Sequence, residues 1–167
     1  MESESSRLLP TAIATEEGVY GIILVSGLVA AAAAAGADSL HALLFVGVTL
    51  IVFWVAHVYA GTVAEHGTVD GEVVGLRTAM LRAVQRSRGL VFSGAVPALP
   101  LLLGAVGVWD DRTAAWVALW VAVAVLGLLG YTAYHRKRAP MHMRIIGALS
   151  TASFGVVIIV AKTLIQH

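Results

Sequence analysis

Long apolar runs separated by short polar turns are the main pattern along this chain. A helix needs about 20 predominantly apolar residues to cross the hydrocarbon core of a bilayer. Five windows reach that length, at residues 17–36, 40–63, 89–109, 113–134 and 143–165. Strands are not expected, because the open edge of a sheet cannot satisfy its hydrogen bonds in lipid. The pattern therefore predicts an all-α integral membrane protein, with a bundle of five transmembrane helices within residues 16–167.

Turn residues and prolines predict where these helices begin, end or bend. Residues 36–39 form a short turn, and the Ser39 hydroxyl is a candidate N-cap for the second helix. Residues 110–113 form a tight turn that is rich in capping side chains. The third window contains Pro97 and Pro100, and each proline removes a backbone hydrogen bond. We therefore expect the third helix to kink or break near its middle.

Residues 72–88 carry an amphipathic pattern that differs from the five apolar windows. Its apolar residues recur at three- and four-residue steps: Val73, Leu76, Met80 and Val84. Four arginines lie mostly away from that stripe: Arg77, Arg82, Arg86 and Arg88. This pattern predicts a cytoplasmic amphipathic helix in the headgroup region, with the arginines contacting lipid headgroups. The alternative is a solvated linker that packs on the bundle.

Basic residues are distributed unevenly between the two sides of the predicted bundle. Nine of the 11 lysines and arginines fall on one side: Arg7, Arg77, Arg82, Arg86, Arg88, Arg136, Lys137, Arg138 and Arg144. Because cytoplasmic loops are enriched in such residues, we expect a cytoplasmic N-terminus and an external C-terminus, in a bacterial-type inner membrane or a plasma membrane. The cluster at residues 136–138 is a second candidate contact for lipid headgroups. Arg112 and Lys162 fall on the outer side, where Lys162 is expected to extend its ammonium to the interface, with a pore-lining role as the alternative.

The overall composition supports a membrane protein and narrows the available chemistry. Of the 167 residues, 59% are apolar and 13% are charged, and the mean hydropathy is +0.87. That leaves too few polar side chains to cover a soluble domain. The chain has no cysteine, which excludes disulfides, thiolate metal sites and cysteine nucleophiles. Residues 1–15 lack the basic region of a cleaved signal peptide, so we expect a short flexible cytoplasmic tail before an uncleaved first helix.

Ionisable residues lie in the second apolar window and just beyond it, where apolar residues would be the default. His57, Gly61 and Glu65 are four residues apart, so they share one side of a helix. If the first two helices are neighbours, Glu17, Tyr59 and these two titratable groups form a cluster near the inner membrane surface. Histidine titrates near neutral pH, so this cluster is a candidate relay for protons or cations. The alternative is a neutral His57 that makes one structural hydrogen bond, with the carboxylates capping helices or reaching the interface.

Small residues at regular spacing predict close helix contacts. Gly147, Thr151 and Gly155 recur every four residues in the last window, and a similar row runs along the first window. Such rows let helix backbones approach closely in lipid. Together with the limited interior of one five-helix bundle, they favour a homo-oligomer.

Motifs for catalysis and for cofactor binding are missing from the sequence. There is no H-E-x-x-H metal motif, and no glycine-rich phosphate loop follows a strand. His41 and His57 fall at different depths, which argues against a haem held by two histidines. We therefore expect no enzymatic activity, no metal and no cofactor, and nothing in the sequence indicates a nucleic-acid partner.

Two functions are compatible with these patterns. The titratable cluster favours a small oligomeric channel or transporter for protons or a small ion, embedded in the lipid bilayer. The arginine-rich segment favours the alternative, a non-transporting scaffold, assembly or sensor subunit that contacts anionic lipid or a partner protein.

Overall fold

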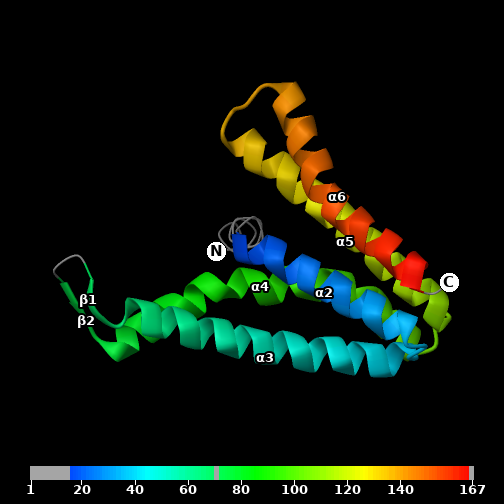
Figure 1. The fold of residues 1–167 in the computed structure, drawn as a ribbon, viewed down its shortest axis with the longest axis horizontal. Coiled ribbons are helices and arrows are strands. Elements are labelled where there is room, and N and C mark those ends of the chain that lie inside the picture. The colour runs from blue at the N-terminus through cyan, green and yellow to red at the C-terminus, as the bar shows by residue number, and fades with distance from the viewer. Residues whose placement is uncertain (1–15, 70–71, 166–167) are drawn as a thin grey trace, which may run out of the picture.

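The computed structural model of this chain describes residues 16–69 and 72–165, so the predicted tail at residues 1–15 lies outside the described part. The described residues form five helices and one two-stranded hairpin (Figure 1). In chain order the elements are α2 (Glu16–Ala34), α3 (Ser39–Glu65), β1 (Gly67–Val69), β2 (Glu72–Val74), α4 (Leu76–Ala105), α5 (Asp111–Arg136) and α6 (Met141–Ile165). All five helices are long and apolar enough to cross a membrane, which confirms the prediction of five such helices.

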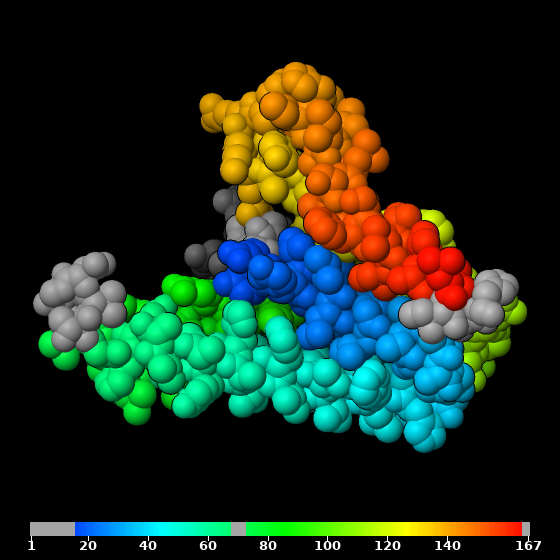
Figure 2. Space-filling model, in the orientation of Figure 1, coloured from blue at the N-terminus to red at the C-terminus, as the bar shows by residue number. Residues whose placement is uncertain are grey.

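Helix α2 lies at the centre of the arrangement and contacts each of the other four helices. Helices α3 and α4 form one antiparallel hairpin, and α5 and α6 form another. The two hairpins meet where α2 ends, α3 and α5 begin, and α4 and α6 end (Figure 1). They diverge toward the opposite end, where the connection between α5 and α6 stands apart from α3 and α4 (Figure 2). We call the first end the convergent end and the second the divergent end.

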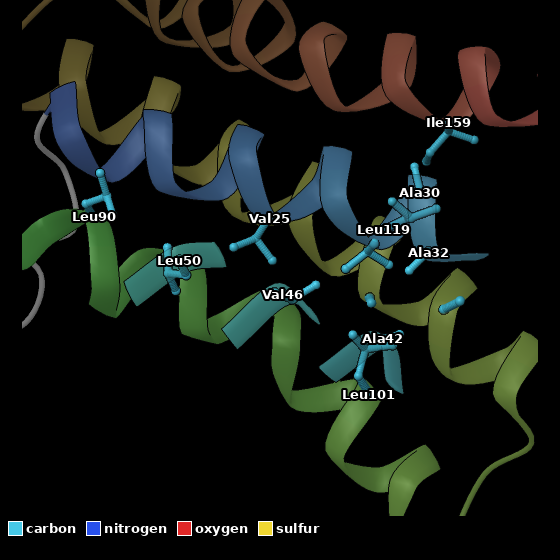
Figure 3. Packing of buried hydrophobic residues seen from close by; sticks show 13 residues of the cluster. Val25, Ala30, Ala32, Ala42, Val46, Leu50, Leu90, Leu101, Leu119 and Ile159 are labelled. Carbon is cyan, nitrogen blue, oxygen red and sulfur yellow. The ribbon is translucent and has the colours of Figure 1, made fainter. Parts of the chain in front are cut away.

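The apolar core draws on all five helices (Figure 3). It includes one buried residue from each: Val25 on α2, Val46 on α3, Leu101 on α4, Leu119 on α5 and Ile159 on α6. The five helices therefore bury side chains against one another in a common core. Each contributes one stripe to a shared core and leaves its other faces outside.

The crossing of α2 and α4 depends on small residues. A Cβ at Gly21 would overlap the carbonyl oxygen of Leu90, so only glycine permits this approach. At the same crossing the Ser93 hydroxyl donates a hydrogen bond of 2.8 Å to the carbonyl oxygen of Gly18. Close backbone approach and interhelical hydrogen bonds are the means by which helices associate in lipid. The α2–α4 contact therefore has the character of a membrane helix pair.

The predicted row on the last helix packs against α5 of the same chain. The Thr151 hydroxyl donates to the carbonyl oxygen of Leu126 on α5 at 2.7 Å. A Cβ on Gly147 would overlap the ring of Tyr134, and Gly155 also faces α5. Since this row is occupied within the chain, it leaves no evident surface for a second copy there.

The prediction of a separate amphipathic helix at residues 72–88 is wrong. Strand β2 occupies the start of that segment, and α4 then continues without interruption to Ala105. The face of α4 that is buried carries Ala79, Ala83 and Ser87, whereas Met80 of the expected apolar stripe is 47% exposed. Small residues on this face bring α3 close, because a Cβ on Gly61 would lie 3.1 Å from the Cβ of Ala83. The position of residues 76–88 is therefore set by the packing of their small side chains on α3. The apolar stripe seen in the sequence does not set it.

Two smaller expectations are also wrong, and a third is contradicted only in part. Strands β1 and β2 pair antiparallel, with Thr68 opposite Val73. They lie beyond the end of α3, outside its apolar window, where the argument from lipid does not apply. Helix α4 continues through Pro97 and Pro100, so the expected break is absent, which neighbouring helices allow in membrane proteins, and the alternative of a kink stays a prediction. The N-cap of α3 is Asp38 and not Ser39, because the Asp38 carboxylate accepts the backbone N–H of the third helical residue.

Candidate functional site

The residues of the expected proton or cation relay do not form one cluster. The His57 ring is half-buried and stacks on Phe53 with ring centroids 6.3 Å apart. The Tyr59 side chain is 71% exposed on α3, and Glu17 lies half-buried in the first turn of α2. Among the described residues, no hydrogen bond or ion pair joins any two of Glu17, His57, Tyr59 and Glu65.

Glu65 instead pairs with the arginine-rich segment. Its carboxylate lies 2.9 Å from the guanidinium of Arg86 on α4, and its second oxygen is buried without a hydrogen-bond partner. The Arg86 side chain is 63% exposed and that of Glu65 is 20% exposed. This ion pair ties the end of α3 to the first half of α4.

The other expected headgroup contacts lie on the outside of the divergent end. Arg77, Arg82 and Arg88 are exposed along the first part of α4. A second exposed group, Arg136, Lys137 and Arg138, lies where α5 ends. The two groups belong to different hairpins, whose backbones separate at the divergent end (Figure 1), so the exposed basic residues lie on two separate arms.

A polar site at the convergent end is the feature that the sequence analysis missed. Lys162 on α6 is only 4% exposed, and its ammonium lies 4.6 Å from the ring centroid of Trp116 on α5. A cavity of about 890 Å³ opens beside it, lined by alanines and by the polar residues Asp38, Asp111, Arg112, Lys162 and Thr163. The expectation that Lys162 extends freely to the interface is therefore not met, because the side chain is held within the chain.

The carboxylates around this cavity are fixed by helix N-termini. Asp38 caps α3 and also accepts from the His41 ring at 2.8 Å. These hydrogen bonds hold the pKa of the Asp38 carboxyl below its ordinary value, and the bond from the His41 backbone has the largest effect. Asp111 accepts the backbone N–H of Ser39 at 2.8 Å through Oδ1, which links α5 to α3. The Ser39 hydroxyl beside this link is buried without a hydrogen-bond partner.

The cations of the cavity have no such partners. Among the described residues, no carboxylate lies within ion-pair distance of Lys162 or Arg112. A buried ammonium without a counter-charge costs free energy, and the ring of Trp116 offsets only part of that cost. The cavity therefore combines two fixed carboxylates with two unpaired cations.

The sequence contains a signal that could have indicated this site. In a five-helix up-and-down bundle, the first and third connections and the end of the last helix fall on the same side. Those segments carry Asp38, Asp111, Arg112 and Lys162, the last two being the only basic residues expected there. Taken together with the topology, they predict a charged group at one end. Taken singly, none of these residues makes that prediction.

Metal-binding geometry is not evident in the described part of the chain, where no three histidine, aspartate or glutamate side chains gather as a group that could hold an ion. No family model matches the sequence, and no curated protein or solved structure matches it significantly. The function of the chain has to be inferred from its own residues and their geometry.

Proposed function

We propose that this protein is a five-span integral membrane protein that acts as a non-transporting scaffold or sensor subunit, and that its basic divergent end binds anionic lipid headgroups on the cytoplasmic side. The single observation that carries the proposal is the exposed basic surface on both arms of that end, formed by Arg77, Arg82 and Arg88 and by the group at residues 136–138. The positive-inside rule then gives a cytoplasmic N-terminus and an external C-terminus.

The outward faces of α3 and α6 support insertion in a bilayer. On α3 the side chains of Leu44, Val48, Ile51, Val52 and Val55 are each more than half exposed. On α6 the same holds for Ile146, Leu149, Phe154, Val157 and Leu164. Contiguous apolar faces of this extent are rare on soluble monomers, whereas a bilayer would cover them.

The length of α4 supports headgroup binding by its arginines. With 30 residues α4 is about 45 Å long at 1.5 Å per residue. The hydrocarbon core of a bilayer is only about 30 Å thick, so roughly one third of α4 has to lie outside it. The apolar part ends at Ala105, so the part left outside is residues 76–85, which carry Arg77 and Arg82, and Arg88 follows within one helical turn of that boundary.

The interior of the chain supports a function without transport. The buried hydroxyls of Ser26, Ser87 and Ser93 all donate to helix carbonyl oxygens, so they offer no free polar lining. The only charged side chain that is buried among the described residues is Lys162, which lies at one end. A path for ions through a single chain would need polar groups along its whole length.

Lipid binding can be tested by native mass spectrometry of the full chain in detergent, with phosphatidylglycerol and phosphatidylcholine added in equal amounts. Wild type should retain the anionic lipid preferentially. The variant Arg77→Gln/Arg82→Gln/Arg88→Gln, which spares the pair between Arg86 and Glu65, should lower that preference at least tenfold, since each arginine near an anionic surface contributes about 1 kcal/mol. Gln85→Ala, also exposed on α4, is the matched control. Equal retention of both lipids by wild type would overturn the proposal.

Topology and transport have direct tests. Because the chain has no cysteine, Thr78→Cys and Val108→Cys give single thiols at exposed positions near opposite ends of α4. In intact cells an impermeant thiol reagent should label only the second variant, and the reverse pattern would contradict the orientation. Proton or cation flux in proteoliposomes above that of empty liposomes would contradict a non-transporting role.

A second candidate function is a proton relay between copies of the chain. It rests on two polar side chains of α3 that lie among apolar residues, the 71% exposed Tyr59 and the half-buried His57, either of which a homo-oligomer would bring against a second copy. Proton flux that is reduced or loses its pH dependence in His57→Gln would favour this function. Unchanged flux in that variant would remove His57 from any relay.

A further inference from the structure

We propose that the cavity at the convergent end binds a phosphate ester that carries a primary ammonium group, the chemistry of phosphoethanolamine. The phosphate would lie against Lys162 and Arg112, and the ammonium against Asp111. This site is separate from the basic divergent end, and the inference does not rest on the function proposed for that end.

Lys162 is the first reason to expect a ligand. It is more than nine-tenths buried, it lines the cavity, and it has no carboxylate partner among the described residues. Its ammonium lies over the Trp116 ring, and the nearby Arg112 has the same charge, so neither neighbour supplies an anionic acceptor for the ammonium hydrogens. A bound phosphate oxygen would supply that acceptor, and charge-assisted hydrogen bonds of this kind are among the strong ones.

The balance of charge around the cavity selects the class of ligand. Lys162 and Arg112 contribute two positive charges, while Asp38 and Asp111 contribute two negative ones. A simple anion attracted by the cations would be repelled by the carboxylates, because all four groups line one cavity. A ligand with both charges avoids this conflict. Asp111 uses only Oδ1 to hold Ser39, so Oδ2 remains for an ammonium.

The location of the cavity fits two sources of this chemistry. The cavity lies where five helix ends meet, at the level where lipid headgroups would surround an inserted bundle. The headgroup of phosphatidylethanolamine is one source, and soluble phosphoethanolamine is the other. Small side chains, including Ala33, Ala37 and Ala115, leave a volume of about 890 Å³, which is ample for either headgroup.

The test uses the full chain in detergent and three probes: soluble phosphoethanolamine, dihexanoyl-phosphatidylethanolamine and inorganic phosphate. Binding is followed by native mass spectrometry and by tryptophan fluorescence, because Trp116 lies in the cavity wall. Binding of both amine-bearing probes supports a soluble ligand, and binding of the lipid alone supports a headgroup site. Binding of neither would overturn the proposal. Equal binding of inorganic phosphate would overturn the role of the ammonium and of Asp111.

Variants then test the residues. Lys162→Met removes the charge and keeps a long side chain, so it should weaken binding at least tenfold, as expected when a charge-assisted hydrogen bond is lost. Lys162→Arg should retain binding, and Asp111→Asn should weaken the amine-bearing probes while sparing phosphate. Arg144→Gln, near the other end of α6, is the matched control and should bind as wild type does. The absence of binding by wild type refutes the proposal whether or not a variant folds. Unchanged binding by a folded Lys162→Met chain would also refute it.

Discussion

Two glycines on α2 allow a sharp test of the helix packing. Gly21 faces α4, where an added Cβ would overlap the backbone oxygen of Leu90 and lie 3.0 Å from the Ser93 hydroxyl. Gly27 lies on the same helix, and a Cβ there would meet no atom within 4 Å. We predict that Gly21→Ala destabilises the protein and that Gly27→Ala does not.

The magnitude follows from the difference between the two variants. Each substitution replaces a helical glycine by alanine, which favours the helix by about 1 kcal/mol. That gain is common to both and cancels in the comparison. Overpacking costs about 1–3 kcal/mol, and the upper half of that range applies at Gly21 because its neighbour is a backbone atom that cannot change rotamer. The two variants should therefore differ by about 2–3 kcal/mol in the free energy of unfolding.

Thermal unfolding in one detergent, followed by loss of helical circular dichroism, measures this difference. For a chain of this size about 1 kcal/mol corresponds to about 2–4 °C in the unfolding midpoint, so Gly21→Ala should melt about 4–12 °C below Gly27→Ala. Gly27→Ala should melt at or slightly above the temperature of wild type. Equal midpoints for the two variants would refute the close α2–α4 crossing.

Three further substitutions test other contacts. Thr151→Val removes the hydroxyl that reaches a carbonyl of α5 and should cost about 0.5–1.5 kcal/mol, measured by the same unfolding assay; no change would mean that this bond contributes nothing. Arg86→Gln should lower the free energy of unfolding by about 1 kcal/mol or less, and Glu65→Gln should lower it by a smaller amount. The reason is that only Arg86→Gln leaves a half-buried carboxylate unpaired. The reverse order of the two effects would contradict the pairing. Hydrogen bonds from Thr113 lower the pKa of Asp110 from its ordinary value of 3.8, so its cap stabilises the fold above pH 3.8 and is lost as the pH falls below it. Wild type should therefore lose more stability on acidification in that range than Asp110→Asn, and parallel acid profiles would exclude this effect.

The helices themselves could be predicted from sequence because their signals are local. Twenty apolar residues in succession specify a helix that can span a membrane, and Asp110 shows its capping role in the turn where it was expected. The course of α4 could not be predicted in this way. Whether residues 76–88 lie in the membrane plane or continue into the next span depends on the partner of their small-residue face, Ala79 and Ala83, and that partner is α3.

The expected relay illustrates the same limit on the functional side. Spacing correctly places His57, Gly61 and Glu65 along one side of α3, but spacing does not identify the neighbour of each. Gly61 meets Ala83 and Glu65 meets Arg86, both on α4, whereas the ring of His57 stacks on Phe53 of its own helix. Helix contacts therefore divide a stripe that the sequence presents as one group.

The two ends of the molecule differ in how their charges are held, and this difference bears on what each can do. At the divergent end the basic groups are exposed, so water already solvates them, and an anionic surface can attract them without any change in the fold. At the convergent end Lys162 has lost almost all of its contact with solvent and has gained only the ring of Trp116. An aromatic ring contributes about 0.5–2 kcal/mol to a cation, while the removal of an ammonium from water costs several kcal/mol. The burial of Lys162 beside one aromatic ring is thus unfavourable by itself, and in the proposed site an anionic group between Lys162 and Arg112 would offset part of that cost.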